Sequence, residues 1–322
     1  MMSNAIRDFA KQFAYLPRVE NAKKLKQRYK NVIITGMGGS RLPALILSAW
    51  KPELSLTIWN DYGLPHIPEP ERKKTLVIVS SYSGNTEEAL DGLALALKKK
   101  LPTAAIAVGG KLLETAKKRK LPYVELPNTG IQPRSALGLS LRALLALIGD
   151  TVGLKETTKL AQVLRPDGLE SKGKALAETL KDRVPVIYAS RANLAIAYNW
   201  KIKLNETGKI PAFYNVFPEL NHNEMNGFDV QPSSRHLSDR FSFILLQDKK
   251  DHQQIQKRML VVKKLYENRG LPVTIQPLEG KTFLEKTFNS LLLADWTAVA
   301  LADLYGLESE QVPMVEEFKT LI

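Results

Sequence analysis

Short, fully apolar runs alternate with helical patterns along most of this chain. The run Leu76–Val79 is typical, because it leads into a polar loop and a helical pattern begins near Thr86. A fully apolar run of this length, bounded by turn residues, indicates a strand that is buried on both faces. Strands of this kind that alternate with helices form parallel sheets covered by helices. The sequence therefore predicts an α/β fold.

The alternation occurs twice. Five strands are expected between residues 31 and 126, and the pattern restarts at Val184 after a polar, helical connection over residues 151–182. Two further helices are expected before the first strand, at residues 5–16 and 22–29. A chain of 322 residues is long enough for two domains of about 150 residues. We place these domains at residues 1–152 and 153–322.

Composition excludes several classes of protein. Cysteine is absent, which excludes disulfides, thiolate metal sites and cysteine nucleophiles. No uncharged run reaches the length of a membrane span. Residues 1–16 carry Arg7, Asp8 and Lys11 and lack the apolar core of a signal peptide. We expect a soluble, cytoplasmic protein with no membrane partner.

The formal net charge is +13, which raises the question of nucleic-acid binding. The basic clusters are scattered in the sequence and stand mostly at expected helix ends or in loops, where Lys and Arg favour the helix dipole. A solvated surface explains this charge better than a specific site, so no nucleic-acid partner is expected. The positive field would still attract anionic metabolites.

A loop rich in hydroxyl groups follows the apolar run at residues 76–79. Ser81, Ser83 and Thr86 place three hydroxyls at a helix start, and Gly84 allows a close approach of the backbone. A helix start also offers unpaired N–H groups and the positive end of the dipole. Together these features suit a phosphate monoester. For this loop taken alone, ordinary helix capping by Ser, Asn and Thr is the alternative.

A second loop, at residues 36–40, also joins a strand to a helix. Gly38 and Gly39 supply backbone N–H groups and Ser40 supplies a hydroxyl, which suits a small anionic ligand. Ligands of open α/β sheets bind at the carboxyl ends of the strands, where both loops are expected. A dinucleotide fingerprint is the alternative, but that motif requires glycine at the position of Arg41.

Charged residues with a potential catalytic use stand in three other segments. Arg134 opens a long helix near the two loops and could stabilise negative charge on a substrate oxygen. Glu206 ends an apolar helix and could act as a base, and His222 suits acid–base chemistry. The alternatives are an exposed arginine, an exposed carboxylate, and a metal ion held by His222, Glu219 and Glu224.

Taken together, these motifs resemble those of the sugar isomerase (SIS) domain proteins, and within them the bifunctional phosphoglucose/phosphomannose isomerases. The resemblance covers nearly the whole chain in the same order and rests on residues 36–40, 81–86, 132–134, 205–206 and 218–224. It implies two SIS domains, each a five-stranded parallel sheet flanked by helices in a flavodoxin-like three-layer sandwich. It also implies a homodimer with active sites at the subunit interface.

The resemblance further implies which residues form the site. Arg134 would stabilise the enediolate, and Glu206 would move the proton between C1 and C2. His222, supplied by the partner subunit, would open the sugar ring together with Lys319 on the C-terminal helix. Residues in the two loops would bind the substrate phosphate or shape its pocket: Gly38, Gly39, Ser40, Ser81, Ser83 and Thr86.

The implied activity is aldose–ketose isomerisation, in which glucose 6-phosphate, and mannose 6-phosphate, interconvert with fructose 6-phosphate through a cis-enediolate. This chemistry needs a base, a group that stabilises oxyanion charge, and an acid–base pair at the ring oxygen. Glu206, Arg134, and His222 with Lys319 fill these roles, so neither a metal nor a cofactor is expected. A non-catalytic SIS regulator that binds a sugar phosphate and an isomerase of another phosphosugar are the alternatives. Arg41 departs from the small residue that family members commonly carry there.

Overall fold

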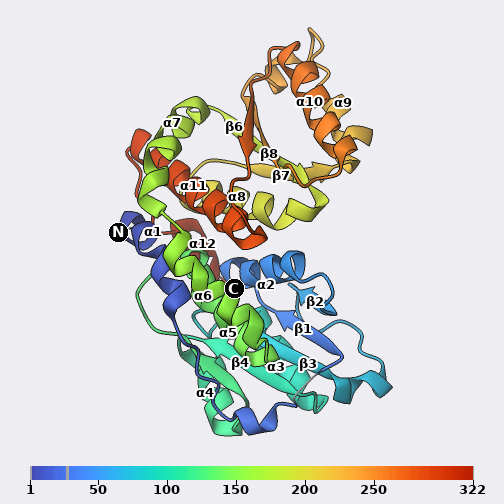
Figure 1. The fold of residues 1–322 in the computed structure, drawn as a ribbon, viewed down its shortest axis with the longest axis vertical. Coiled ribbons are helices and arrows are strands. Elements are labelled where there is room, and N and C mark those ends of the chain that lie inside the picture. The colour runs from blue at the N-terminus through green and yellow to red at the C-terminus, as the bar shows by residue number, and fades with distance from the viewer. Residues whose placement is uncertain (1, 27–28, 322) are drawn as a thin grey trace. The chain divides into compact units, whose positions relative to one another are not determined.

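A computed structural model describes residues 2–26 and 29–321 of the chain (Figure 1). The chain divides into two compact units. The first unit is Asp8–Leu164, and the second comprises Met1–Arg7 and Arg165–Ile322. The predicted domain boundary after residue 152 stays a prediction. The division between the compact units falls after Leu164, later in the chain than residue 152, because helix α6 (Thr151–Val163) packs on the first unit. There the Arg142 guanidinium donates to the Leu154 carbonyl oxygen of α6.

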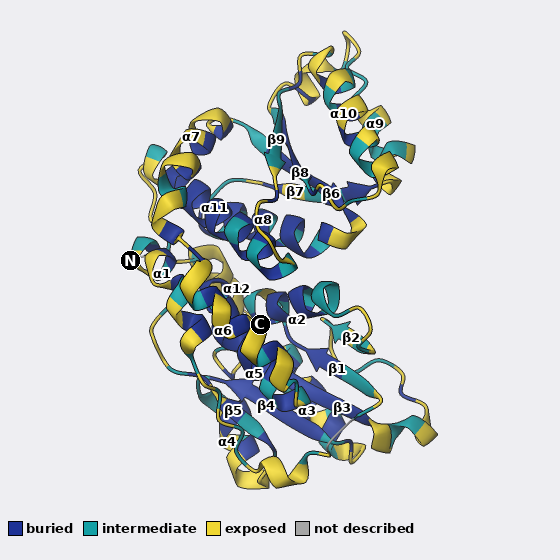
Figure 2. Ribbon diagram, viewed as in Figure 1, coloured by how far each residue is buried: buried dark blue, intermediate teal, exposed yellow. Residues whose placement is uncertain are grey.

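The first unit contains a five-stranded sheet with the strand order β2-β1-β3-β4-β5, and all neighbouring strands are parallel. Residues 75–80 and 103–107, the two strands at its centre, are buried throughout, as their apolar sequences predict (Figure 2). The strands are β1 (Asn31–Thr35), β2 (Leu56–Trp59), β3 (Thr75–Ser80), β4 (Thr103–Ala107) and β5 (Tyr123–Glu125).

Helices cover both faces of this sheet. Successive side chains of a strand point to opposite faces, so the apolar strands have apolar side chains to bury on both faces. On one face, Val77 and Ala105 pack with apolar residues of α3 and α4. On the other, α2 and α5 pack against each other and against the strands. The helices are α2 (Gly38–Trp50), α3 (Glu87–Lys98), α4 (Gly110–Arg119) and α5 (Leu137–Ile148). The predicted α/β fold, with a parallel sheet flanked by helices, is confirmed here.

The second unit contains a parallel sheet with the order β7-β6-β8-β9. Its strands are β6 (Val184–Ser190), β7 (Phe213–Phe217), β8 (Phe241–Gln247) and β9 (Val273–Pro277). The expectation of five strands in each sheet is wrong for this unit, which has four among the described residues. After β9 the chain enters the long helix α11 (Phe283–Leu304), and the segment that follows, residues 305–312, is too polar to form another buried strand.

The helices of the second unit also lie on both faces of its sheet. Tyr188 and Phe243 pack against Met259 and Tyr266 of α10 in one core cluster. On the other face α11 packs against α7 and α8. The helices not yet bounded are α1 (Met2–Arg7), α7 (Glu170–Leu180), α8 (Leu194–Glu206), α9 (Glu224–Gly227), α10 (Gln253–Glu267) and α12 (Pro313–Leu321).

The two helices expected before the first strand are shorter than predicted. The first is divided at Asp8 into α1 and the 3-10 helix η1 (Phe9–Ala14), which belong to different units. Of the second, only Ala22–Lys24 is helical (η2), and residues 27 and 28 lie outside the described residues. The apolar residues of this lysine-rich segment, Ala22, Leu25 and Tyr29, are not buried, and short helices depend on tertiary packing for their stability.

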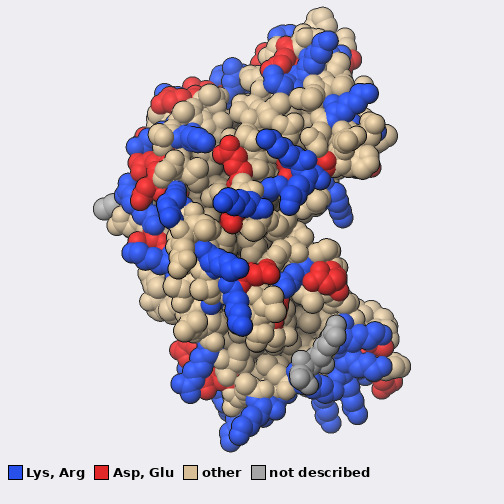
Figure 3. All heavy atoms as spheres, in the orientation of Figure 1, with Lys and Arg blue, Asp and Glu red and all other residues tan. Residues whose placement is uncertain are grey.

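Basic clusters that are separated in the sequence gather at one edge of the first sheet. Arg72–Lys74 precedes β3, Lys98–Lys100 precedes β4, and Lys117–Lys120 precedes β5. Because these strands are parallel neighbours, their amino ends share an edge, and the loops after their carboxyl ends share the opposite edge. We call these the amino edge and the carboxyl edge. Lys and Arg side chains are prominent on the face shown in Figure 3.

Within residues 2–26 and 29–321, none of the helices combines the length and the apolar character that crossing a lipid bilayer requires.

Candidate active site

The glycine and serine loops of the first unit touch each other at the carboxyl edge. Ser40, in the first turn of α2, is buried, and its Oγ accepts a hydrogen bond of 2.9 Å from the backbone N–H of Tyr82. Ser80 Oγ donates to the Ser40 carbonyl oxygen at 3.3 Å. A Cβ atom on Gly36 would lie 2.5 Å from the Ser80 carbonyl oxygen. Only a small residue fits where the two backbones approach so closely.

The serine loop is organised by its own hydroxyl groups. Ser81 is 1% exposed, and its Oγ accepts from the backbone N–H of Gly84 at 3.1 Å and shares a hydrogen bond of 2.8 Å with Thr86 Oγ1. Ser83 Oγ accepts from the backbone N–H of Asn85 at 3.2 Å. Ser83 is exposed and Thr86 is half-buried. In this structure Ser81 therefore shapes the loop, whereas Ser83 is open to a ligand.

The same loop is held from behind by the β4–α4 connection. Gly84 has φ +75°, and a Cβ atom there would lie 1.9 Å from the Gly109 carbonyl oxygen. Asn85 Oδ1 accepts from the backbone N–H of Lys111 at 3.0 Å, and the N–H of Leu112 donates to the Gly84 carbonyl oxygen at 2.9 Å. These contacts fix the serine loop as one rigid piece.

A third segment joins the two loops. Arg134 lies in the 3-10 helix η4 (Pro133–Ser135) and is 1% exposed. A Cβ atom on Gly39 would lie 2.7 Å from the backbone nitrogen of Arg134, so η4 rests on the start of α2. Arg41 is half-buried in the same helical turn. The first unit thus gathers seven predicted site residues on its carboxyl edge: Gly38, Gly39, Ser40, Ser81, Ser83, Thr86 and Arg134.

Glu206 is the last residue of α8 in the second unit and is half-buried. It lines a cavity of about 680 Å³ between the end of α8, the chain that leads into β7, and the start of α12. Lys209 Nζ donates to the Glu206 carbonyl oxygen at 2.7 Å and also to the Gln311 carbonyl oxygen, which ties the helix end to the chain before α12. The cavity is lined by Lys201, Asn205, Glu206, Lys209, Ile210, Pro211, Ala212, Phe213, Val312, Pro313, Met314 and Val315.

A buried ion pair anchors α8 just before Glu206. Lys203 Nζ lies 2.6 Å from Asp295 Oδ1 of α11, and the two side chains are 0% and 5% exposed. Lys203 and Glu206 are three residues apart, less than one helical turn. The pair therefore restrains the part of α8 that presents the carboxylate.

His222 lies in the 3-10 helix η7 (Glu219–His222), beyond the end of β7, and is exposed. The two neighbouring carboxylates are both occupied by hydrogen bonds within the protein. Glu219 Oε1 accepts from Asn223 Nδ2 at 3.0 Å, and Glu224 Oε1 accepts from the Tyr188 hydroxyl at 2.5 Å. In the described part of the chain, no three His, Asp or Glu side chains come together in a way that could hold a metal ion.

Glu206 and His222 lie at opposite edges of the second sheet. The cavity around Glu206 includes Phe213, where β7 begins, whereas His222 follows Phe217, where β7 ends. A strand of this length spans about 16 Å at about 3.3 Å per residue. Within one chain, the structure therefore does not bring these two residues together.

Lys319 lies on α12, whose described residues are all at the surface. Its Nζ is 2.7 Å from Glu316 Oε1, and both side chains are more than half exposed. The first turn of α12 lines the cavity that contains Glu206, but Lys319 does not. The structure thus places Lys319 on the same helix as that cavity wall but outside the cavity.

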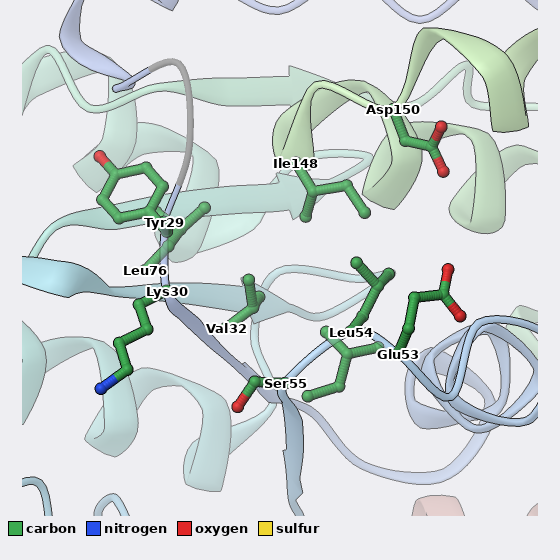
Figure 4. Close-up of a pocket in the computed structure, with 10 residues that line it drawn as sticks. Tyr29, Lys30, Val32, Glu53, Leu54, Ser55, Leu76, Ile148 and Asp150 are labelled. Atoms are coloured by element: carbon green, nitrogen blue, oxygen red, sulfur yellow. The ribbon is translucent and has the colours of Figure 1, made fainter.

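Another cavity, of about 530 Å³, lies at the amino edge of the first sheet (Figure 4). Its floor is apolar, and Glu53 and Asp150 stand on one side of it while Tyr29 stands on the other. The residues that line it are Tyr29, Lys30, Val32, Glu53, Leu54, Ser55, Leu56, Leu76, Ile148 and Asp150. None of them is a predicted site residue, and the glycine and serine loops lie at the other edge.

Sequence reasoning missed the partners of Glu224. Tyr188 comes from β6 and Asn215 from β7, and both donate to its carboxylate at 2.5 Å. One signal was present in the sequence: Tyr188 interrupts the apolar run of a buried strand, and a buried tyrosine hydroxyl usually has a hydrogen-bond partner. Which side chain supplies that partner depends on the tertiary fold.

Comparison with known proteins agrees with this architecture. Residues 169–322 match the family described as the bacterial phospho-glucose isomerase C-terminal SIS domain. The chain is 33% identical over 318 residues to a bifunctional phosphoglucose/phosphomannose isomerase of Aquifex aeolicus, over 98% of this chain and 96% of that protein. It is 36% identical over 307 residues to the protein of that name from Caldicellulosiruptor bescii, over 89% of this chain and 88% of the relative.

A solved structure shares the fold. A hypothetical protein from Thermus thermophilus superimposes with a TM-score of 0.71 over 99% of this chain and 88% of its own, at 18% identity. The parallel sheets flanked by helices and the matched C-terminal SIS domain place the chain among the SIS-type α/β proteins. Within that class, the chain belongs to the family of bifunctional phosphoglucose/phosphomannose isomerases, an isomerase family, as its motifs predict.

Proposed function

We propose that this protein interconverts glucose 6-phosphate and mannose 6-phosphate with fructose 6-phosphate through a cis-enediolate, using neither a metal nor a cofactor. The similarity over 98% of the chain to a relative named for both activities carries the proposal. The proposal includes two SIS domains, at residues 1–152 and 153–322. It is supported by the gathering of the seven loop residues at one edge of the first unit.

The proposed roles follow from what each group can supply. The exposed hydroxyl of Ser83, with Thr86 and Ser40, binds the phosphate at the start of α3 and α2, where backbone N–H groups and the helix dipole favour an anion. Arg134, a buried cation beside these loops, stabilises the negative charge that builds on the enediolate oxygen. Binding the phosphate away from the reacting carbons holds C1 and C2 in place.

Proton transfer is assigned to the second unit. Glu206 moves the proton between C1 and C2, and this residue lines a cavity whose walls are largely apolar. His222 and Lys319 act at the ring oxygen. A carboxylate, a fixed cation and an acid–base pair suffice for the reaction, which is why no metal is proposed.

The catalyst is proposed to be a homodimer in which His222 comes from the partner subunit. The placement of Glu206 and His222 at opposite edges of one sheet supports this arrangement, because the two residues can then serve one sugar only when a second copy supplies one of them. Two-fold symmetry would create two identical sites per dimer.

The proposed reaction is tested by offering fructose 6-phosphate to the purified protein in the presence of a chelator and measuring both aldose phosphates. We expect glucose 6-phosphate and mannose 6-phosphate to form, and Glu206→Gln to abolish both while fructose 6-phosphate still raises the melting temperature. Glucose 6-phosphate alone would remove mannose from the proposal. Binding without turnover by the wild type would favour a non-catalytic regulator, and full turnover by Glu206→Gln would remove Glu206 from the mechanism.

The shared site is tested by mixing two strongly impaired variants, Glu206→Gln and His222→Ala, under conditions that exchange subunits. If Glu206 and His222 of different chains form a site, each mixed dimer regains one intact site. Random exchange of equal amounts then restores about one quarter of the wild-type activity in a two-fold dimer. No recovery, with exchange verified by mass spectrometry, would show that both residues act within one chain. Full activity of His222→Ala by itself would show that His222 is not required.

A further inference from the structure

The short segment that carries His222 is held at its apolar side by the core of the second unit. Leu220 is fully buried and belongs to the same core cluster as Tyr188 and Phe217. Met225, on the other side of His222, packs against this cluster. The exposed His222 therefore stands on an arc, residues 219–224, whose two flanks turn inward.

A second contact holds the arc to α10. Arg258 Nη1 donates to Asn221 Oδ1 at 3.2 Å. In the described part of the chain, by contrast, the His222 side chain takes part in no hydrogen bond or ion pair. The position of its imidazole consequently depends on the backbone of the arc.

The third contact, made by the Glu224 carboxylate, consists of hydrogen bonds to a charged acceptor. The Glu224 carboxylate accepts from Tyr188 on β6 through Oε1 and from Asn215 on β7 through Oε2, both at 2.5 Å. Its backbone N–H donates to Asn223 Oδ1 at 2.5 Å. Hydrogen bonds to an ionised acceptor are about twice as strong as neutral ones. Both oxygens of this carboxylate are thus fixed to two neighbouring strands.

The phenols around this carboxylate stay protonated. Burial, with the neighbouring phenol and carboxylate, raises the pKa of Tyr188 well above its usual range, and burial raises the pKa of Tyr266 to about 12. At neutral pH Tyr188 can therefore only donate to Glu224. Tyr266 OH lies 3.4 Å from Tyr188 OH and closes the network toward α10.

We propose that Glu224 is a positioning residue that clamps the arc to β6 and β7, so that His222 projects in the orientation needed for ring opening. This inference rests on the proposed function, in which His222 acts at the ring oxygen. Glu224 itself touches no reacting atom, and its effect on the reaction passes through His222. Glu219 lies on the same arc, and among the described residues its side chain bonds only to Asn223, which is also on the arc.

The test compares Glu224→Gln with the matched control Glu219→Gln. Glutamine keeps the shape of Glu224, but its NH2 group is a donor and would face either the Tyr188 hydroxyl or the Asn215 amide, which are donors themselves. One of the two hydrogen bonds is therefore lost. We expect kcat to fall by about ten- to a hundredfold, as misplacement by about 1 Å does, with little change in KM. Hydrogen exchange of residues 218–228 should also quicken. Glu219→Gln should change neither quantity by more than about twofold, in line with a surface substitution.

A double variant separates positioning from a general loss of structure. Two changes that act through one group are not additive, so adding Glu224→Gln to His222→Ala should cause no further loss of the residual kcat that His222→Ala retains. Tyr188→Phe, which removes one clamp bond and keeps the ring, should give a smaller loss of the same kind and serves if Glu224→Gln fails to fold.

Several results would overturn the inference. Wild-type kcat in Glu224→Gln would do so, as would an equal loss of kcat in the His222→Ala background, which would show that Glu224 acts independently of His222. A wild-type protein without isomerase activity refutes the proposed function first. Hydrogen exchange then decides the clamp by itself, since unchanged exchange in Glu224→Gln would show that the carboxylate does not hold the arc.

Discussion

Removing the carboxylate of the buried ion pair on α8 should strongly destabilise the second unit. Asp295→Asn keeps the shape of the side chain but leaves Lys203, whose side chain is 0% exposed, without its 2.6 Å counter-charge. Breaking one partner of such a pair costs about 3–5 kcal/mol, because the remaining charge stays buried and uncompensated. At about 2–4 °C per kcal/mol for a unit of this size, the melting temperature should fall by about 6–20 °C.

The assay is thermal and urea unfolding followed by circular dichroism, with activity measured in parallel below the transition. The matched control replaces both partners, Lys203→Met with Asp295→Leu. Replacing both charges with apolar side chains is often close to neutral, so the control should recover most of the stability. If Asp295→Asn alone costs less than about 1 kcal/mol, the range of an exposed pair, then the charge on Lys203 is not buried as the structure indicates.

Three further predictions concern other parts of the chain. Gly84→Ala should raise KM for fructose 6-phosphate and lower the melting temperature, because its Cβ would lie 1.9 Å from the Gly109 carbonyl oxygen. The control Gly130→Ala, at a similar φ of +71° and with nothing within 4 Å of the added Cβ, should leave KM unchanged. Equal KM values in the two variants would contradict the close contact at Gly84. Arg142→Met should lower the free energy of unfolding by about 2–4 kcal/mol, because it removes the charged donor to the Tyr15 and Leu154 carbonyl oxygens. Proteolysis within α6 should become faster. An unchanged cleavage rate would show that Arg142 does not hold α6 in place. Burial raises the pKa of Asp251, so the folded state disfavours the ionised carboxylate, and the protein gains stability as the pH falls below the pKa of the folded state. Asp251→Asn should therefore raise the melting temperature at neutral pH. This advantage should be lost near about pH 3, where the carboxyl group is protonated in both the folded and the unfolded state. A gain that persists at acidic pH would assign the effect to something other than ionisation.

The elements that sequence predicted best are those with long, regular apolar patterns. Helix α11 and strand β3 occur at the predicted residues, because burial of their apolar side chains determines them. Helix α12 also occurs at its predicted residues, although none of its residues is buried. The lysine-rich helix expected at residues 22–29 failed because its apolar residues are not buried, and propensity without tertiary packing does not hold a short helix together. The missing fifth strand of the second sheet was an extension from family resemblance, which residues 305–312 do not support.

The candidate site was predictable where topology alone brings residues together. Parallel strands place the loops after β1 and β3 at one edge, so Ser40 and Ser81 had to be neighbours once the fold was known. Contacts between distant side chains were not predictable in this way. Neither the bond from Tyr188 to Glu224 nor the internal role of the Ser81 hydroxyl leaves a pattern in the sequence, because each depends on how two packed segments meet.

The basic amino edge of the first sheet gives this unit a preferred orientation on charged materials. Three clusters, Arg72–Lys74, Lys98–Lys100 and Lys117–Lys120, meet there, opposite the loops at the carboxyl edge. On an anionic resin or electrode at low ionic strength, the first unit should adsorb by its amino edge and leave its glycine and serine loops facing the solution. Immobilisation by charge should therefore keep those loops accessible, whereas chemical coupling through random lysines would present them in every direction.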